Sequence, residues 1–166
     1  MDFSGAVFSG RMDFSGAVFS GGTVSFHGVT FSGGTVSFAD AAFSSGTVSF
    51  NSAAFSGSEV SFDHAAFSDS EVLFISAAFS DSEVLFISAA FSDSEVLFIS
   101  AAFSGGEVYF GSAAFGTVSP GSAAFSGGEV LFEYATGPAP TGLLAAVGTP
   151  APATVVLPSA WVPPVP

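Results

Sequence analysis

Residues 67–102 contain the twelve-residue unit FSDSEVLFISAA three times in succession without a change. Looser copies precede this block from Phe19 onward, and a further copy, FSGGEVYFGSAA, follows it at Phe103. Self-similarity at a fixed period is the signature of a repeat architecture. Stacked identical units provide identical environments, whereas a catalytic site needs unlike groups to converge. The repeat therefore predicts a scaffold and not an enzyme.

The repeat becomes irregular at both ends of the chain. A related unit, MDFSGAVFSG, begins at Met1 and again at Met12. Near the other end, a ten-residue copy containing Pro120 is followed by a half copy, FSGGEVLF, that ends at Phe132. Periodicity stops after Glu133, and residues 137–166 hold eight of the nine prolines. We therefore expect two parts, a tandem-repeat β-solenoid over 1–133 and an irregular Pro-rich tail over 134–166.

The unit itself predicts β-structure. Val72-Leu73-Phe74 is rich in strand-forming residues, and no apolar stripe with a helical period runs through the repeat. The turn-prone residues fall in Ile75-Ser76 and in Ser80-Asp81-Ser82. Each unit is thus expected to form two short strands joined by two corners. The predicted fold class is all-β, a β-solenoid of tandem repeats.

Stacking the units would place like residues on like residues about 4.8 Å apart. Val72 and Phe74 share one face of a strand, as do Ala77 and Phe79, so Phe, Val and Ala are expected to fill a narrow interior. With one unit per coil, each Phe would stack on the Phe twelve residues further along. Such stacks need caps at their ends. The tail either extends freely or folds back so that Trp161 and Leu143 cover the last coil.

The five residues Ala77-Ala78-Phe79-Ser80-Asp81 have a central Phe and a small residue two positions before it. In this respect the chain, over about Asp2–Phe132, resembles the pentapeptide-repeat family, especially its Phe-Ser-Gly-rich variants from high-GC bacteria. The resemblance implies a right-handed β-helix with four-sided coils. Two extra residues, such as Ser82-Glu83, interrupt the five-residue rhythm in every unit. A two-sided solenoid with twelve residues per coil and a flat meander of hairpins therefore stay open as alternatives.

The charge balance restricts the partners. Fourteen acids oppose one cation, Arg11, for a net charge of −13. Binding to nucleic acid or to an anionic membrane surface needs Lys and Arg, so neither is expected. The chain has no Cys, its apolar runs are far shorter than a membrane span, and its start lacks the features of a signal peptide. We expect a cytoplasmic protein whose partner is another protein or a second copy of itself.

Acidic residues recur with the repeat and form two predicted ladders. Carboxylates stacked about 4.8 Å apart would repel one another by about 1 kcal/mol per pair in water. Some proteins in the family that the chain resembles imitate DNA and occupy the DNA-binding saddle of gyrase, which makes a topoisomerase-directed DNA mimic one interpretation. A solvated face that resists aggregation is the other. The ladders comprise Glu59, Glu71, Glu83, Glu95 and Glu107, and Asp69, Asp81 and Asp93.

Aliphatic residues flank the second Phe of each of the three identical units. Strand alternation turns them away from the Phe side, so we expect one contiguous outer patch across three coils. Such a patch marks an interface, and it predicts dimerisation or binding of a protein partner. Its members are Leu73, Ile75, Leu85, Ile87, Leu97 and Ile99.

Signals for chemistry are weak. His27 and His64 occupy non-equivalent copies, and Asp63-His64 lie on opposite faces if they are part of a strand, which argues against a Ser-His-Asp triad. The acidic columns could supply oxygen ligands to calcium, but the glycine-rich calcium-binding repeat is absent. We therefore predict no catalytic residues, no cofactor and no metal.

Overall fold

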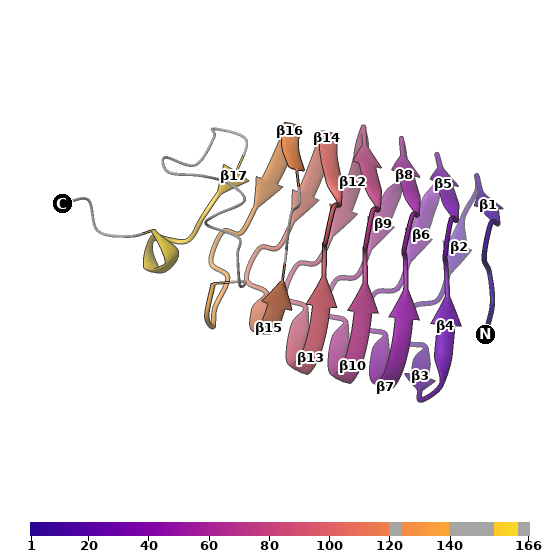
Figure 1. The fold of residues 1–166 in the computed structure, drawn as a ribbon, viewed down its shortest axis with the longest axis horizontal. Helices are drawn as coiled ribbons and strands as arrows, with labels where there is room; N and C mark the ends of the chain where they lie inside the picture. Colours follow the sequence, from indigo (N-terminus) through magenta and orange to yellow (C-terminus); the bar gives the residue numbers. More distant parts are fainter. Residues whose placement is uncertain (120–123, 140–154, 163–166) are drawn as a thin grey trace.

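The computed structural model describes residues 1–119, 124–139 and 155–162. Within these residues, two β-sheets wind into a solenoid that has the N-terminus at one end and the tail at the other (Figure 1). The eleven-stranded sheet contains β1 (Val7–Phe8), β2 (Met12–Asp13), β5 (Thr30–Ser32), β6 (Thr35–Ser37), β8 (Ala54–Ser56), β9 (Glu59–Ser61), β11 (Ala78–Ser80), β12 (Ser82–Leu85), β14 (Ala102–Tyr109), β16 (Ala124–Leu131) and β17 (Val155–Val156). The six-stranded sheet contains β3 (Val18–Ser20), β4 (Thr23–Ser25), β7 (Ala42–Ser49), β10 (Ala66–Leu73), β13 (Ala90–Leu97) and β15 (Ala114–Ser119). A short 3₁₀ helix, η1, spans Ser159–Trp161.

Strand register shows that one coil contains two repeat units. Phe67 of β10 pairs with Phe91 of β13, and Phe79 of β11 pairs with Phe103 of β14, a step of 24 residues in both sheets. Consecutive units therefore lie in opposite sheets. The expectation of one unit per coil, with each Phe stacked on the Phe twelve residues later, is wrong. The flat meander is also wrong, because every strand pair in the described residues is parallel.

The reason for the longer coil lies in the corners. At the end of β10, the Ala77 N–H donates to the Phe74 carbonyl at 3.1 Å and Ser76 has a φ of 58°. A hydrogen bond from residue i+3 to residue i with a positive φ at i+2 corresponds to a type II turn. Asp69 has a φ of 50° and makes the second corner of the same unit. Both predicted corners of the unit are thus confirmed, but together they complete only half a circuit.

Four stacks of Phe rings fill the interior. Phe74 lies parallel to Phe50 and Phe98, with ring centroids 4.9 and 4.8 Å apart. Across the interior it meets Phe86 edge to face, with centroids 6.0 Å apart. Offset stacks and edge-to-face pairs are the arrangements that aromatic rings favour. Four inward Phe and four corners per coil correspond to the four-sided alternative. The stacks begin at Phe3, Phe8, Phe14 and Phe19.

The predicted filling of the core by Phe, Val and Ala is confirmed. Phe74, Val72 and Ala77 have no exposed surface, and their counterparts through the middle of the stack are equally buried. Complete burial of an apolar side chain of this size contributes roughly 1.5–3 kcal/mol. Each ring therefore adds to the stability of its own coil and of the two coils it contacts.

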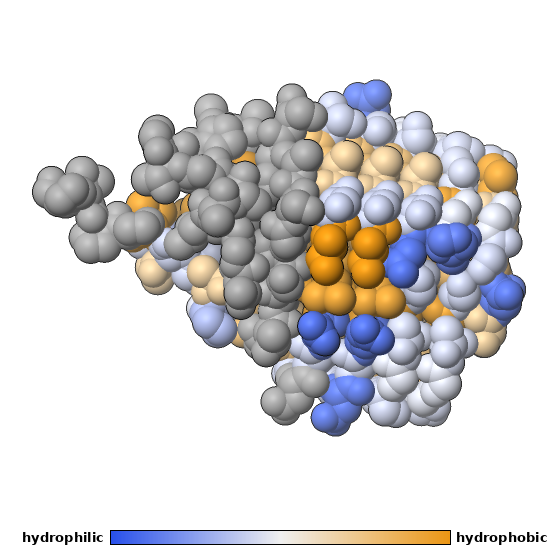
Figure 2. Space-filling model, viewed as in Figure 1, coloured by the Kyte–Doolittle hydropathy of each residue, from blue (hydrophilic) through white to orange (hydrophobic). Residues whose placement is uncertain are grey.

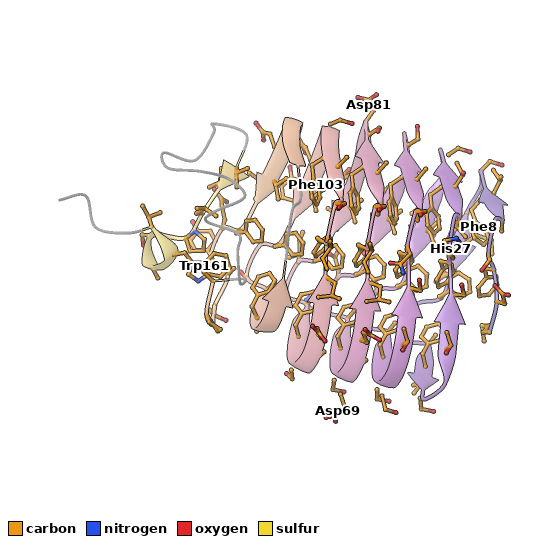
Figure 3. All side chains as sticks on the ribbon, viewed as in Figure 1. Phe8, His27, Asp69, Asp81, Phe103 and Trp161 are labelled. Atoms are coloured by element: carbon orange, nitrogen blue, oxygen red, sulfur yellow. The ribbon has the colours of Figure 1, made fainter. Side chains whose placement is uncertain are left out.

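The described part of the tail covers the C-terminal end of the solenoid. Val155 in β17 pairs with Val130 in β16, which adds one more parallel strand to the stack. The centroid of the Trp161 ring lies 5.6 Å from that of Phe115 and 5.5 Å from that of Phe132. The Trp161 Nε1–H donates a hydrogen bond to the Gly137 carbonyl at 3.0 Å. Trp161 lies at the end opposite Phe8 (Figure 3). Of the two alternatives for the tail, Trp161 adopts the capping one, whereas Leu143 lies outside the described residues.

Candidate functional site

The structure divides the six predicted aliphatic residues between two faces of the solenoid. Leu73 pairs with Leu97 in the six-stranded sheet, whereas Leu85 pairs with Tyr109 in the eleven-stranded sheet. The single contiguous patch across three coils is therefore wrong, because consecutive units lie on opposite sides. One side carries a set that we call the aliphatic patch: Leu73, Ile75, Leu97 and Ile99. The other side carries Leu85 and Ile87.

The aliphatic patch is compact and open on its outer side. It is visible in Figure 2 as adjacent orange side chains over β10 and β13. Ile99 is 36% exposed, and Leu73, Ile75 and Leu97 are half-buried. Apolar groups that recur at the coil spacing present a regular ridge to solvent. An apolar ridge with polar surroundings is characteristic of a protein interface.

Polar residues bound the aliphatic patch on two sides. Glu71 and Glu95 pair in register two residues before Leu73 and Leu97. One coil nearer the N-terminus, the Asn51 Oδ1 accepts a hydrogen bond from the Ile75 N–H at 2.9 Å. This contact fixes the turn that presents the Ile75 side chain. A partner at this patch would therefore meet aliphatic groups with a row of carboxylates beside them.

The predicted Glu ladder is likewise divided. Glu83 pairs with Glu59 and with Glu107, and Glu107 pairs with Glu129, so four carboxylates form one column on the eleven-stranded sheet. Glu71 and Glu95 belong to a column on the other sheet that begins with Thr23 and Thr47. Glu129 was not among the predicted ladder residues, because it belongs to the half copy. Its FSGGEVLF motif was the signal that could have identified it.

The predicted Asp ladder is also split between corners. Asp69 and Asp81 project from opposite edges of the solenoid in Figure 3, and both are exposed with a φ of 50°. The side chain of Asp93 lies outside the described part of the chain. A short polar side chain tolerates the left-handed conformation that these corners require. The corner geometry therefore accounts for Asp here without any ligand.

The acids have few cationic partners. In the described residues, the one ion pair joins Arg11 and Asp13, at 3.1 Å. Glu71 accepts a hydrogen bond from the Thr47 hydroxyl at 3.3 Å. The Tyr109 hydroxyl donates to Glu107, and this bond, together with burial and the neighbouring carboxylates, raises the pKa of Tyr109 to about 12. The Glu columns thus retain an uncompensated negative charge.

The interior of the solenoid also contains serine hydroxyls, which were not predicted from the sequence. Four serines at the fourth position of the unit are at most 4% exposed, and none of their hydroxyls has a hydrogen-bond partner among the protein atoms. Strand alternation could have identified them, since each lies two residues before an inward Val. They are Ser58, Ser70, Ser82 and Ser94.

Nothing in the described residues resembles a catalytic or metal centre. No three His, Asp or Glu side chains gather where they could hold a metal ion. His27 and His64 are exposed, and His64 occupies a turn with a φ of 57°. A shallow hollow beside Tyr134 and Leu157 has Glu133 as its one charged lining residue. None of the helical segments in this part of the chain has the length and apolarity that a membrane-crossing helix requires.

Comparison with known proteins gives a match to a repeat family over part of the chain. A family model described as pentapeptide repeats (9 copies) matches residues 3–48, which form the first two coils. A solved structure of trypsin-treated QnrB1, a plasmid-mediated fluoroquinolone resistance protein, is similar at 12% sequence identity with a TM-score of 0.20. That alignment covers 78% of this chain and 83% of the other. No curated protein matches.

Proposed function

We propose that the chain is a non-enzymatic repeat scaffold that binds a protein partner through the aliphatic patch. The observation that carries the proposal is the pairing of Leu73 with Leu97 on one face, with Ile75 and Ile99 beside them. When a partner covers a surface of this kind, its apolar area is removed from water. That removal is favourable by roughly 25 cal/mol of free energy per Å² of apolar area.

The chemistry of the patch defines the partner that it fits. Aliphatic side chains would cover the Leu and Ile ridge, and Lys or Arg beside them would meet Glu71 and Glu95. Because the chain has a net charge of −13, a basic partner would also be attracted before contact. Binding should therefore persist at high salt, because apolar contacts are not screened. The association rate should fall as salt rises, because the attraction between opposite charges is screened.

A matched pair of variants tests this proposal. Ile75→Ser with Ile99→Ser removes the ridge, whereas Ile87→Ser makes the same kind of change on the opposite side of the solenoid. A partner purified with the wild-type chain should bind the Ile87→Ser variant with unchanged affinity in calorimetry and should bind the double variant at least tenfold more weakly. Equal affinities for the two variants would contradict the assignment of the patch.

Self-association is the other role that we assign to this scaffold, and the same variants test whether the patch is responsible. If sedimentation shows a wild-type dimer that Ile75→Ser with Ile99→Ser converts to monomer, the occupant of the patch is a second copy. If the dimer persists in the double variant, the patch is reserved for a different protein.

A second candidate function rests on the Glu column of the eleven-stranded sheet. Glu59, Glu83 and Glu107 follow one another at the coil spacing, and no cation pairs with them in the described residues. This repeated charge favours a mimic of a nucleic-acid backbone that acts on a topoisomerase such as gyrase. Opposing cationic surfaces would bind it with an affinity that falls steeply as ionic strength rises.

Supercoiling by purified gyrase measures this second function. Inhibition should weaken between low and moderate salt and should disappear in a variant with Glu59→Gln, Glu83→Gln and Glu107→Gln. Glu71→Gln with Glu95→Gln, on the other sheet, is the control and should inhibit like the wild type. Absence of inhibition by the wild-type chain at micromolar concentration would refute the mimic.

A further inference from the structure

A row of apolar side chains crosses four coils of the eleven-stranded sheet, on the side of the solenoid opposite the aliphatic patch. Leu85 of β12 pairs with Tyr109 of β14, and Tyr109 pairs with Leu131 of β16. Leu131 pairs in turn with Val156 of β17. These strands follow one another along the stack (Figure 1). The first three side chains are half-buried and Val156 is 36% exposed. We call these four residues the apolar row.

The apolar row is longer than the aliphatic patch. In the six-stranded sheet, the equivalent position is apolar in two coils only, because it is serine before them at Ser49 and after them at Ser119. In the eleven-stranded sheet it is apolar in four successive coils. Three steps of ~4.8 Å give a row of ~14 Å. Covering this length requires a segment of chain rather than a single side chain.

A row of carboxylates runs beside the apolar row. Glu83, Glu107 and Glu129 pair in register, each two residues before a member of the apolar row. Residues two apart in a strand share a face and lie ~6.6–6.8 Å apart. The Tyr109 hydroxyl joins the two rows, because it donates a hydrogen bond to Glu107. This bond, burial and the charges of Glu107, Glu83 and Glu129 together raise the pKa of Tyr109 to about 12. Carboxylates from three coils thus act on one point of the apolar row.

Acidic and apolar residues occur together along the chain. Five units have Glu followed two residues later by Leu or Tyr, and they begin at Phe67, Phe79, Phe91, Phe103 and Phe125. Where Thr replaces this Glu, Ser replaces the apolar residue, as in Thr23-Val24-Ser25 and Thr117-Val118-Ser119. Glu59 followed by Ser61 is the exception. An acid that serves solubility alone needs no apolar neighbour. The coupling therefore indicates a surface that meets cationic and apolar groups of one partner together.

The chain itself supplies almost no cation for these carboxylates. Arg11 is the one Lys or Arg in the sequence, and it pairs with Asp13 at 3.1 Å. A second copy has the same net charge of −13 and would bring further carboxylates with one cation. Nucleic acid and an anionic lipid surface also carry negative charge. Charge complementarity therefore selects a protein segment that is rich in Lys and Arg.

The coil spacing selects the conformation of that segment. In an extended strand, side chains on one face recur every ~6.6–6.8 Å, so three steps cover ~20 Å and overshoot the row by more than one coil. In an α-helix, one face recurs with each turn of ~5.4 Å, so three turns cover ~16 Å, within about 2 Å of the row. Side-chain flexibility accommodates the smaller difference. A helix of about ten residues with apolar groups three and four positions apart therefore matches the row.

A hollow at the end of the row offers an anchor point. Val156 belongs both to the apolar row and to this hollow, whose volume is about 310 Å³. Leu157, Pro158 and the exposed Tyr134 also line it, together with Glu133. This volume is at the lower limit for small-ligand sites, so the hollow suits one large apolar side chain of a partner. Anchors of this kind supply much of the binding energy of an interface.

We propose that the apolar row and the carboxylates beside it bind a basic amphipathic helix of a partner protein, which lies along the solenoid axis. Leu or Ile residues of the helix cover the row, and Lys or Arg on one flank meet Glu83, Glu107 and Glu129. Three helical turns form a contact much smaller than the ~1,600 Å² of a standard interface, so binding is weak and reversible. This surface is separate from the aliphatic patch. It shares carboxylates with the second candidate function but requires apolar contacts that a mimic of nucleic acid does not.

Two synthetic peptides of about 15 residues serve as probes, because shorter helices are marginal in water. In the helical probe, Leu recurs at every third or fourth position, Lys flanks the Leu stripe on one side, and Ala fills the remaining positions. The alternating probe has the same composition, with Leu at every second position, which suits an extended strand. Fluorescence anisotropy of the labelled peptides measures their binding to the full chain.

A matched pair of variants locates the contact. Leu85→Ser with Leu131→Ser removes two members of the apolar row. Leu73→Ser with Leu97→Ser makes the same changes at the same position of the unit in the six-stranded sheet. Folding is retained in both variants, because serine already occupies this position one coil before Leu85 and one coil before Leu73.

The expected result is that the helical probe binds the wild-type chain at least about tenfold more tightly than the alternating probe does. Leu85→Ser with Leu131→Ser should weaken this binding at least about tenfold, whereas Leu73→Ser with Leu97→Ser should leave it unchanged. Glu83→Gln with Glu107→Gln should weaken binding at low salt and reduce its salt dependence. Circular dichroism should give the same β-sheet spectrum for the wild type and all variants.

Four results would each overturn the proposal. They are no binding of the helical probe to the wild-type chain, equal binding of the two probes, equal loss of affinity in the two Leu variants, and an affinity that Glu83→Gln with Glu107→Gln leaves unchanged. Partner binding at the aliphatic patch and inhibition of gyrase are measured without these peptides, so their failure is distinguishable from failure of the helix site.

Discussion

Replacement of the buried serines by alanine should stabilise the solenoid. In the folded chain, the hydroxyls of Ser58, Ser70, Ser82 and Ser94 are buried without a partner among the protein atoms. In the unfolded chain, each hydroxyl is hydrated. Folding therefore removes hydrogen bonds to water that no protein group replaces, and alanine at these positions avoids this loss.

The magnitude follows from the structure. An unsatisfied buried polar group costs about 1–3 kcal/mol. Alanine also removes the packing of the hydroxyl oxygen, which offsets part of the gain, so we expect each substitution to raise the free energy of unfolding by about 1 kcal/mol. Ser58 stacks on Ser82 and Ser70 on Ser94, one coil apart in each case, so effects within a pair should not be strictly additive. All four changes together should add about 2–4 kcal/mol.

Equilibrium unfolding in urea, followed by circular dichroism, measures the change. Ser80→Ala is a matched control, because its hydroxyl lies near the surface and is within hydrogen-bond distance, 3.1 Å, of the Ser104 hydroxyl. This control should change the free energy of unfolding by less than about 0.5 kcal/mol. Destabilisation by Ser70→Ala and Ser82→Ala would refute the reasoning, because it would mean that these hydroxyls are bonded in the folded protein.

Three other substitutions test the core, a corner and the Glu column. Phe74→Ala removes a ring stacked between Phe50 and Phe98. The free energy of unfolding, measured in urea, should fall by about 3–5 kcal/mol. A decrease of less than about 1 kcal/mol would exclude the stacked interior. Gly106→Ala should lower the free energy of unfolding by more than about 2 kcal/mol, because Gly106 has a φ of 72° and a Cβ there would clash with the Ser82 carbonyl oxygen. Gly111→Ala is the control. Its Cβ would meet only an ordinary contact at 3.8 Å, so it should have little effect. In a Tyr134→Phe background, phenolate absorbance should show Tyr109 titrating near a pKa of about 12, and Glu107→Gln should return that pKa towards 10.0. Because folding raises this pKa, the stabilising contribution of protonated Tyr109 is complete below pH 10 and should be lost between pH 10 and about 12; constant stability across that range would contradict it.

The local structure of the unit could be predicted from sequence because local chemistry determines it. Ser76 and Asp81 stand at turns with positive φ, which short polar residues tolerate. Phe74 and Val72 lie on the inward face that strand alternation indicates. The number of units per coil was not predictable in this way, because it depends on the angle through which each corner turns the chain. The type II turn after Phe74 and the bend at Asp69 leave the chain on the opposite side of the core.

The errors about the candidate sites have the same origin. Leu73 and Leu85 have identical sequence surroundings, so sequence alone gave no reason to separate them. Register assigns Leu73 to the six-stranded sheet and Leu85 to the eleven-stranded sheet. The acidic ladders were divided for the same reason. The inward serines could have been recognised by counting two residues back from Val72 and Val84.

Because each coil contains two units, the effect of gaining or losing repeat units depends on whether their number is odd or even. Deletion or duplication of a single twelve-residue unit upstream of Leu73 would turn every later unit through half a circuit and move Leu73 and Leu97 to the face that now carries Leu85. Gain or loss of two units would keep each residue on its face and only lengthen or shorten the stack. Two lineages of such a gene could therefore differ by one repeat, retain the same Phe interior and stability per coil, and yet present exchanged surfaces to their partners.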